Sequence, residues 1–369
     1  MRNPSLDILR AVAVLLVFCY HCAGVPLVTR FGWTGVDLFF VLSGFLVSGL
    51  LFREYRETGY LRPGRFLLRR GLKIYPQFYF FVAFTFALAC WRGQAPRIGQ
   101  VLAELGFVQN YAPGIWAHTW SLAIEEHFYL LLTFGFLMLS RRGGANPFRA
   151  LPVWIAGACG LVLGLRLLTW VLHPEITDYR QVFPSHLRMD SLLTGVGIAY
   201  YQAFHGAELA RSMKRLGPWI PPASILLLAP VSFLTREDPF MVTAGFSMVS
   251  WGFGLLLLSV LYPAKPAVAR PSRGARAMAV LGQNSYAFYL WQGPVLMGGD
   301  RLQAFAQAHG RPLPLLAIFA ITFFGTLLTA FATTRLLEIP VLRLRDRYFP
   351  APPRRAPSEE RVLALSGTS

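Results

Sequence analysis

Arg10 and His21 interrupt an otherwise apolar stretch, LRAVAVLLVFCYHC at residues 9–22. Eleven residues make three helical turns plus about 20°, so the two side chains share one face and lie about 16 Å apart along the axis. An imidazole changes its protonation near neutral pH, which suits a general base or acid. The spacing predicts that His21 moves a proton inside the membrane and that Arg10 lies nearer the start of the same helix.

Two carboxylates, Asp37 in GVDLFF and Glu125 in LAIEEHF, are predicted in the outer half of other helices, as His21 is. A carboxylate can fix the tautomer of an imidazole and stabilise the imidazolium, as in a catalytic triad. We therefore predict a catalytic group of His21, Arg10, Asp37 and Glu125. Charged groups in lipid cost about 2.5 to 3.5 kcal/mol each on insertion scales, so a hydrated internal cavity is expected around them.

A further set of polar and aromatic residues is predicted at the outer ends of these helices, where an acceptor molecule could enter. Its members are Trp116, His118, Trp120, Arg188, Asp190 and Gln292. We expect this set to bind substrate, and His118 is a rival base. The chain has four cysteines, all within apolar stretches, so disulfides are not expected. No spacing of Cys and His residues indicates a metal site.

Arg69, Arg70 and Lys73 form a cationic cluster in RFLLRRGLKIYP. Their spacings of three and four residues place them on neighbouring positions of one helix surface. The cluster is predicted at the cytoplasmic end, where it would bind the phosphates of an anionic ligand. The same charges could instead serve only to orient the helix in the membrane.

Apolar helices must position these residues, because the 369 residues are 54% hydrophobic and only 14% charged. The mean hydropathy is +0.46, which is typical of membrane proteins rather than soluble domains. We predict an all-α integral membrane fold in which about ten transmembrane helices enclose a polar central cavity. The expected spans are 6–27, 35–52, 66–91, 119–140, 150–172, 184–205, 218–235, 239–262, 278–299 and 313–337.

The net charge of +17 comes largely from alternate loops. This is the positive-inside bias, which predicts that both termini are cytoplasmic and makes nucleic-acid binding unnecessary as an explanation of the charge. Arg10 interrupts the first apolar segment, so a cleavable signal peptide is not expected. Residues 1–349 are predicted to form one membrane domain, and residues 350–369, rich in Pro and polar residues, a disordered cytoplasmic tail.

The chain resembles the acyltransferase 3 family in the order and spacing of several stretches. Besides Arg10 and His21, these are GVDLFFVLSGFL, RRGLKIYP, HTWSLAIEEHFYLL, RMDSLLTG, LGQNSYAFYLW and LLEIP. The resemblance implies ten helices, an essential histidine at His21 supported by Arg10, and transfer of an acyl group, commonly acetyl, from cytoplasmic acyl-CoA to a hydroxyl. Lys73 stands where the family usually has a second arginine. Gln292 stands where it often has a histidine, so no second base is expected there.

The resemblance implies a multi-pass enzyme of the plasma (inner) membrane whose partners are acyl-CoA, a glycan or other hydroxyl acceptor, and the lipid bilayer. No permanently bound cofactor is expected. Alternatives stay open. The acceptor could be a macrolide or lipid modified at the cytoplasmic side, and an acyl-histidine or acyl-Ser43 intermediate could form. His21 and the glutamates could also be the proton relay of a transporter for an anionic or glycan substrate. Asp37 and Glu125 could be structural partners of Arg188, and Arg10 could simply reach the interface.

Overall fold

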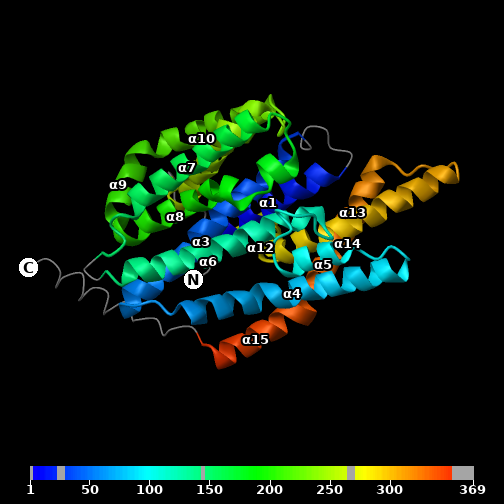
Figure 1. Ribbon diagram of the computed structural model, residues 1–369, viewed down its shortest axis with the longest axis horizontal. Coiled ribbons are helices and arrows are strands. Elements are labelled where there is room, and N and C mark those ends of the chain that lie inside the picture. The colour runs from blue at the N-terminus through cyan, green and yellow to red at the C-terminus, as the bar shows by residue number, and fades with distance from the viewer. Residues whose placement is uncertain (1–2, 23–29, 143–145, 264–270, 351–369) are drawn as a thin grey trace, which may run out of the picture.

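The computed structural model describes residues 3–22, 30–142, 146–263 and 271–350. Within these residues all regular structure is helical, and most of the long helices run along the long dimension of the molecule (Figure 1). The predicted tail 350–369 lies outside the described residues except for Pro350, as do residues 23–27 of the first expected span.

Among the described residues, seven helical segments are long and apolar enough to cross a membrane, so the protein is a multi-pass helical membrane protein. They are α1 (Pro4–His21), η1 with α3 (Gly32–Thr34, Gly35–Thr58), α4 (Pro63–Trp91), η2 with α6 (Ala117–Thr119, Trp120–Ser140), α7 (Leu151–Leu172), η7 with α11 (Met241–Gly245, Phe246–Leu261), and α14 with η8 and α15 (Leu315–Thr333, Thr334–Glu338, Ile339–Tyr348).

Three of the ten expected spans form helices that are shorter or interrupted. The span at 184–205 becomes η4 (Ser185–Leu187) and the 16-residue α8 (Met189–Phe204). The span at 218–235 becomes η5 (Gly217–Trp219), α10 (Ile220–Leu228) and η6 (Ala229–Ser232). The span at 278–299 is divided between α12 (Arg273–Gln283) and α13 (Ser285–Ala308). The count of ten therefore stays a prediction.

Several helix ends differ from the expected bounds for local reasons. α1 stops at His21 rather than at residue 27. α3 continues beyond residue 52 to Thr58, where Arg56 lies in the last turn and Gly59 ends the helix with a φ of 80°. A basic residue suits the negative end of the helix dipole, and glycine adopts the left-handed C-terminal conformation at little cost. α4 begins early, at Pro63, because proline is well suited to the first helical position.

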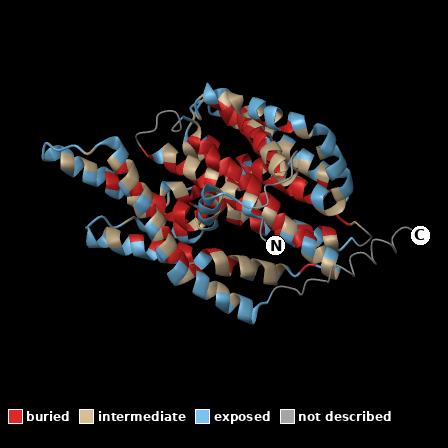
Figure 2. Ribbon diagram, turned by 180° about the vertical axis from the view of Figure 1, so that it is seen from behind, coloured by how far each residue is buried: buried red, intermediate tan, exposed pale blue. Residues whose placement is uncertain are grey.

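The backbones of α3 and α8 approach closely where they cross, and two motif glycines make this crossing possible. A β-carbon at Gly44 would lie 1.9 Å from the carbonyl oxygen of Leu192, and one at Gly195 would lie 2.1 Å from that of Val41. Small residues let helix backbones approach in a membrane. This crossing brings the outer end of α3, with Asp37, against the start of α8. Figure 2 shows that buried residues concentrate in these central helices.

Three further helical elements complete the fold. They are α5 (Ile98–Leu105), η3 (Asp178–Val182) and α9 (Gly206–Leu216). The end of α3, the start of α4, the end of α6 and α9 lie toward one end of the molecule (Figure 1). Those ends carry basic residues, among them Arg56 in the last turn of α3 and Lys214 and Arg215 in the last turn of α9. The predicted cytoplasmic loops therefore lie at one end of the fold.

Candidate active site

A cavity of about 40 Å³ lies between the helix ends that the sequence predicts to be on the outer side of the membrane. It is lined by residues of α1, η1, α3, η2, α6, η3, the start of α8, the loop before η7, and α13: Val17, Tyr20, His21, Trp33, Val36, His118, Trp120, Val182, Arg188, Arg236 and Tyr289. Four predicted residues from three separate stretches, His21, His118, Trp120 and Arg188, thus line one cavity.

His21 is the last residue of α1 and lines this cavity. Its Nδ1 lies 2.9 Å from the carbonyl oxygen of Val17, one turn earlier. A carbonyl can only accept, so this contact requires the proton on Nδ1 and leaves Nε2 of the neutral ring as an acceptor. The side chain is exposed rather than buried as expected, because the helix ends here instead of continuing.

The expected contact between a carboxylate and His21 is not formed among the described residues. Asp37 accepts hydrogen bonds from Arg188 and Ser191. Glu125 accepts from Ser43 and Tyr129. The backbone carbonyl of Val17, rather than an acidic side chain, is therefore the group positioned to fix the histidine tautomer.

Arg188 and Asp37 form a buried ion pair at the α3–α8 crossing, and both side chains are at most 1% exposed. Nη2 of Arg188 donates to Oδ1 and Oδ2 of Asp37 at 2.9 and 3.0 Å. The guanidinium carbon lies 3.7 Å from the ring centroid of Phe246. This ion pair is one of the arrangements that the sequence left open, and it places Arg188 at the cavity wall.

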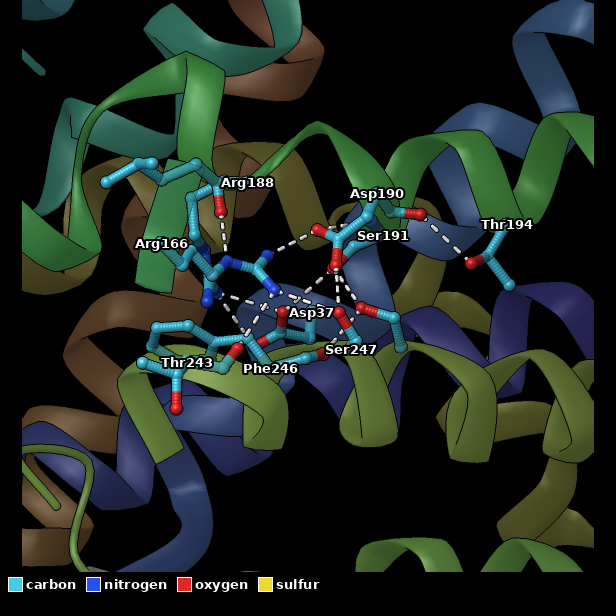
Figure 3. Close-up of polar contacts among 11 residues, drawn as sticks. Asp37, Arg166, Arg188, Asp190, Ser191, Thr194, Thr243, Phe246 and Ser247 are labelled. Atoms are coloured by element: carbon cyan, nitrogen blue, oxygen red, sulfur yellow. Dashed lines mark hydrogen bonds and ion pairs between the residues drawn. The ribbon is translucent and has the colours of Figure 1, made fainter. Parts of the chain in front are cut away.

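Asp190 lies in the same network but on its far side from the cavity lining. Arg166 of α7 donates to Asp190 at 2.5 Å and to the carbonyl oxygen of Leu187 at 2.6 Å, and Ser247 donates to Asp190 at 2.8 Å. Figure 3 shows these contacts beside the Asp37 contacts. Asp190 thus holds α7, α8 and α11 together, and it is not among the residues that line the cavity.

His118 packs against α13. Its Nε2 lies 3.1 Å from the carbonyl oxygen of Leu290. A β-carbon at Gly293 would lie 2.5 Å from Cε1 and 2.8 Å from Nδ1 of His118, so only glycine leaves room for the ring. Both ring nitrogens therefore face α13. The hydroxyl of Tyr289 donates to the carbonyl oxygen of His118 at 2.5 Å and lies 2.6 Å from Oγ of Ser121.

Trp116 and Gln292 lie near this region without lining the cavity. Nε1 of Trp116 donates to Oγ1 of Thr85 at 3.0 Å, and the Trp116 and His118 rings are 5.8 Å apart between centroids. Gln292 is 1% exposed, and neither amide atom has a hydrogen-bond partner among the described residues.

One face of α6 carries polar residues from the cavity toward the basic end of the molecule. Ser121, Glu125 and Tyr129 recur every four residues and so lie on one side of the helix, about 12 Å from first to last. Glu125 accepts from Ser43 at 2.6 Å and from Tyr129 at 2.7 Å. Arg70 bonds to the Tyr129 hydroxyl and lies 3.8 Å from Glu125. This polar face of α6 joins Glu125 to the cationic cluster.

The cationic residues near the other end have different partners. Arg69 donates to Asp346 of α15 at 3.0 Å and to the carbonyl oxygen of Phe349. Lys73 is half-buried on the next turn of α4. Arg10 lies 3.3 Å from Asp7, one turn earlier in α1. Arg70 is thus the member of the cluster that contacts the polar face of α6, whereas Arg69 contacts the C-terminal helix.

Arg236 and Tyr289 line the cavity, and the sequence did not single them out. Arg236 pairs with Asp178 at 2.6 Å and with Glu237 at 3.1 Å. Burial alone would lower the pKa of Arg236, but the pairing with Asp178 raises it overall. Arg236 resembled an ordinary loop residue in LTREDP. The four-residue recurrence of Ser121, Glu125 and Tyr129 was visible in the sequence and could have identified the polar face of α6.

These features define a class: a multi-pass helical membrane protein with a histidine, an arginine and aromatic side chains around one small cavity. The acyltransferase 3 family, described as an acyltransferase domain, matches residues 3–335. The chain belongs to that family.

The chain is also similar to curated proteins over much of its length. The peptidoglycan O-acetyltransferase OatA of Listeria monocytogenes serovar 1/2a is 26% identical over 332 residues, which cover 79% of this chain and 49% of that protein. The O-acetyltransferase OatA of Staphylococcus aureus strain MRSA252 is 26% identical over 383 aligned positions, covering 98% and 61%. The chain thus spans about half to three fifths of the length of these relatives. No solved structure matches it significantly.

Proposed function

We propose that this protein is an integral membrane O-acyltransferase of the plasma (inner) membrane. It moves an acyl group, acetyl, from cytoplasmic acyl-CoA to a hydroxyl of a glycan, with His21 as general base. The relatives' names support an acetyl group, and that of the Listeria protein supports a peptidoglycan-type acceptor.

The observation that carries the proposal is the placement of His21 at the cavity with Nε2 available as an acceptor. A general base must lie within hydrogen-bond reach of the proton that it removes. Nδ1 is engaged by Val17, so Nε2 is the atom that can take a proton from an acceptor hydroxyl in the cavity. His118 is less suited to this task, because its two ring nitrogens face Leu290 and Gly293 of α13.

The polar face of α6 supports a route for the donor. Arg70 and Lys73 lie near the start of α4, at the end that carries the basic loops, and cations there suit the phosphates of CoA. From Arg70 the polar face leads through Tyr129 and Glu125 toward Ser121, which contacts Tyr289 of the cavity. We infer that the acyl thioester extends along this face to reach His21.

The transfer itself needs no oxidant and leaves the protons balanced. Nε2 of His21 takes the proton of the acceptor hydroxyl while the oxygen forms a bond to the carbonyl carbon of the thioester. The tetrahedral intermediate carries the negative charge on its carbonyl oxygen. When an electron pair of this oxygen re-forms the carbon–oxygen double bond, the carbon–sulfur bond breaks, and the thiolate takes the proton from the imidazolium. The products are an O-acyl ester and free CoA.

The test uses the purified full chain in proteoliposomes with labelled acetyl-CoA and a panel of glycan fragments. Wild-type protein is expected to release CoA and form an ester, and His21→Ala to lower the rate by about 100-fold or more. His309→Ala is the matched control, since His309 also ends a helix, and its Nδ1 also lies near the carbonyl oxygen one turn earlier, 2.8 Å from Phe305. Transfer by His21→Ala at the wild-type rate would contradict the assignment of the base.

A further inference from the structure

Arg188 lines the cavity and has two side-chain nitrogens without a hydrogen-bond partner among the described residues. The side chain is 1% exposed, yet Nε and Nη1 have no hydrogen-bond partner among the described residues. Nη2 alone makes both contacts with Asp37. An arginine commonly offers a carboxylate two nitrogens in parallel, which would have used another donor here. The pairing of Nη2 with Asp37 leaves Nε and Nη1 without a partner among the described residues, in a side chain that lines the same cavity as His21.

Arg166 shows that the same fold can satisfy a buried arginine fully. Its Nε donates to Leu187, its Nη1 to Ser247 at 3.0 Å, and its Nη2 to Asp190 (Figure 3). Arg166 is as buried as Arg188, but it is not among the residues that line the cavity. The two unpartnered nitrogens therefore distinguish Arg188, which lines the cavity, from Arg166.

The guanidinium group of Arg188 is held in a fixed orientation. The guanidinium carbon lies 3.7 Å from the centroid of the Phe246 ring, and Nη2 donates to Asp37. Cation–π contact and an ion pair together restrict rotation of the guanidinium plane. Donors fixed in advance, in a site with little water, stabilise a charge that develops during a reaction more strongly than the same donors do in water.

The charges around the cavity favour a transient anion over a permanently charged ligand. Asp37 already balances the charge of Arg188, and Asp178 and Glu237 balance that of Arg236. A carbonyl oxygen is neutral before attack and negative in the tetrahedral intermediate. An unpartnered N–H donor beside an ion pair with no net charge matches that change.

We propose that Arg188 is a catalytic residue: one of its two unpartnered nitrogens, Nε or Nη1, donates to the carbonyl oxygen of the acyl group and stabilises the oxyanion formed when the acceptor oxygen attacks. This inference rests on the proposed acyl transfer. Arg188 forms and breaks no covalent bond: the negative charge moves onto the carbonyl oxygen during attack and leaves with the thiolate, while His21 handles the proton.

The test compares Arg188→Lys with Arg166→Lys in proteoliposomes supplied with acetyl-CoA. Lysine keeps the charge beside Asp37 but has no counterpart of the unpartnered Nε and Nη1. Arg188→Lys is expected to lower kcat by about 100-fold while KM for donor and acceptor changes less than about threefold. Arg166→Lys is expected to keep kcat close to wild type. Equal losses of kcat in the two variants, or a raised KM with unchanged kcat for Arg188→Lys, would overturn the proposal.

A second acyl donor distinguishes a catalytic role of Arg188 from a structural one. Chloroacetyl-CoA forms a more stable oxyanion, so the deficit of Arg188→Lys is expected to shrink with it, whereas a structural defect would be the same with both donors. If Arg188→Lys does not fold, the double variant Asp37→Asn, Arg188→Gln removes the pair without leaving an unpaired charge, and the same comparison applies. Wild-type protein that transfers no acyl group would end the proposed function and this role together. Wild-type transfer with an unaffected kcat in the variant would end this role alone.

Discussion

At the scale of single residues, Glu104 shows how a side chain remote from the cavity can fix the site. Its Oε2 accepts from the backbone N–H of Ile115 at 2.9 Å and of Trp116 at 3.4 Å, and its Oε1 accepts from the Thr119 hydroxyl at 2.5 Å. Burial raises the pKa of Glu104, although these three donors act in the opposite direction. Glu104, which lies in α5, thereby holds the segment that carries His118 against α5.

Replacing Glu104 tests this role. Glu104→Ala leaves two backbone N–H groups without their acceptor, so we expect the free energy of unfolding to fall by about 3 kcal/mol. Glu104→Gln is the matched variant and should stay within about 1 kcal/mol of wild type. Its amide oxygen can accept from the backbone, while its NH₂ group faces Thr119, whose hydroxyl can donate to the carbonyl oxygen of Trp116 at 2.7 Å. Unfolding in detergent measures both, and equal losses would contradict the hydrogen-bond argument.

At the scale of elements, the crossing of α3 with α8 brings Asp37 to Arg188. The stretches GVDLFFVLSGFL and RMDSLLTG each combine a charged residue with a glycine, and the two glycines make the backbone contact that the two charges need. The sequence identified both stretches and left a structural Asp37–Arg188 pair open. It could not show that this pair leaves Nε and Nη1 of Arg188 without a partner among the described residues, because that depends on the position of α11 and Phe246.

The crossing predicts a difference between two glycines of α8. A methyl group at Gly195 would meet the carbonyl oxygen of Val41 at 2.1 Å, so Gly195→Ala forces the helices apart. We expect a loss of about 3 kcal/mol of stability, with reduced acyl transfer as Asp37 and Arg188 separate. At Gly197 the nearest atom to an added β-carbon is 3.9 Å away, so Gly197→Ala should behave like wild type. Thermal unfolding in detergent distinguishes them, and a Gly195→Ala protein as stable as wild type would refute the close crossing.

At the scale of the whole molecule, the arrangement has two ends with different chemistry. The basic loops and the start of α4 lie at one end, and the cavity lies between the helix ends that are predicted to be on the outer side. The polar face of α6 connects the two through Glu125 and Tyr129. This polarity is what transfer from a cytoplasmic donor to an acceptor beyond the membrane would require.

The predicted orientation can be tested with cysteine labelling. Cys90 is a free, exposed thiol in the last turn of α4, and Arg56 is exposed in the last turn of α3. In right-side-out vesicles, a variant that keeps only Cys90 should react with a membrane-impermeant maleimide. A variant with Arg56→Cys as its only cysteine should react only after permeabilisation, because the positive-inside bias predicts that the basic loop is cytoplasmic. The reverse order of labelling would show that the chain is oriented the other way.

The sequence by itself determined the helical membrane class and the residue types at the site. Apolar runs and the positions of Arg and Lys are local properties, and His21, His118, Trp120 and Arg188 stood out because polar groups are costly in lipid. It did not fix which helices are continuous at residues 184–205, 218–235 and 278–299.

Only the tertiary structure decided which polar groups contact one another. Asp37 pairs with Arg188 and Glu125 with Ser43 and Tyr129, whereas His21 contacts its own helix. Depth along a helix gives one coordinate of a side chain. The rotation of each helix and the neighbour it packs against give the others, and these are set by contacts between segments far apart in the chain, such as that of Gly44 with Leu192.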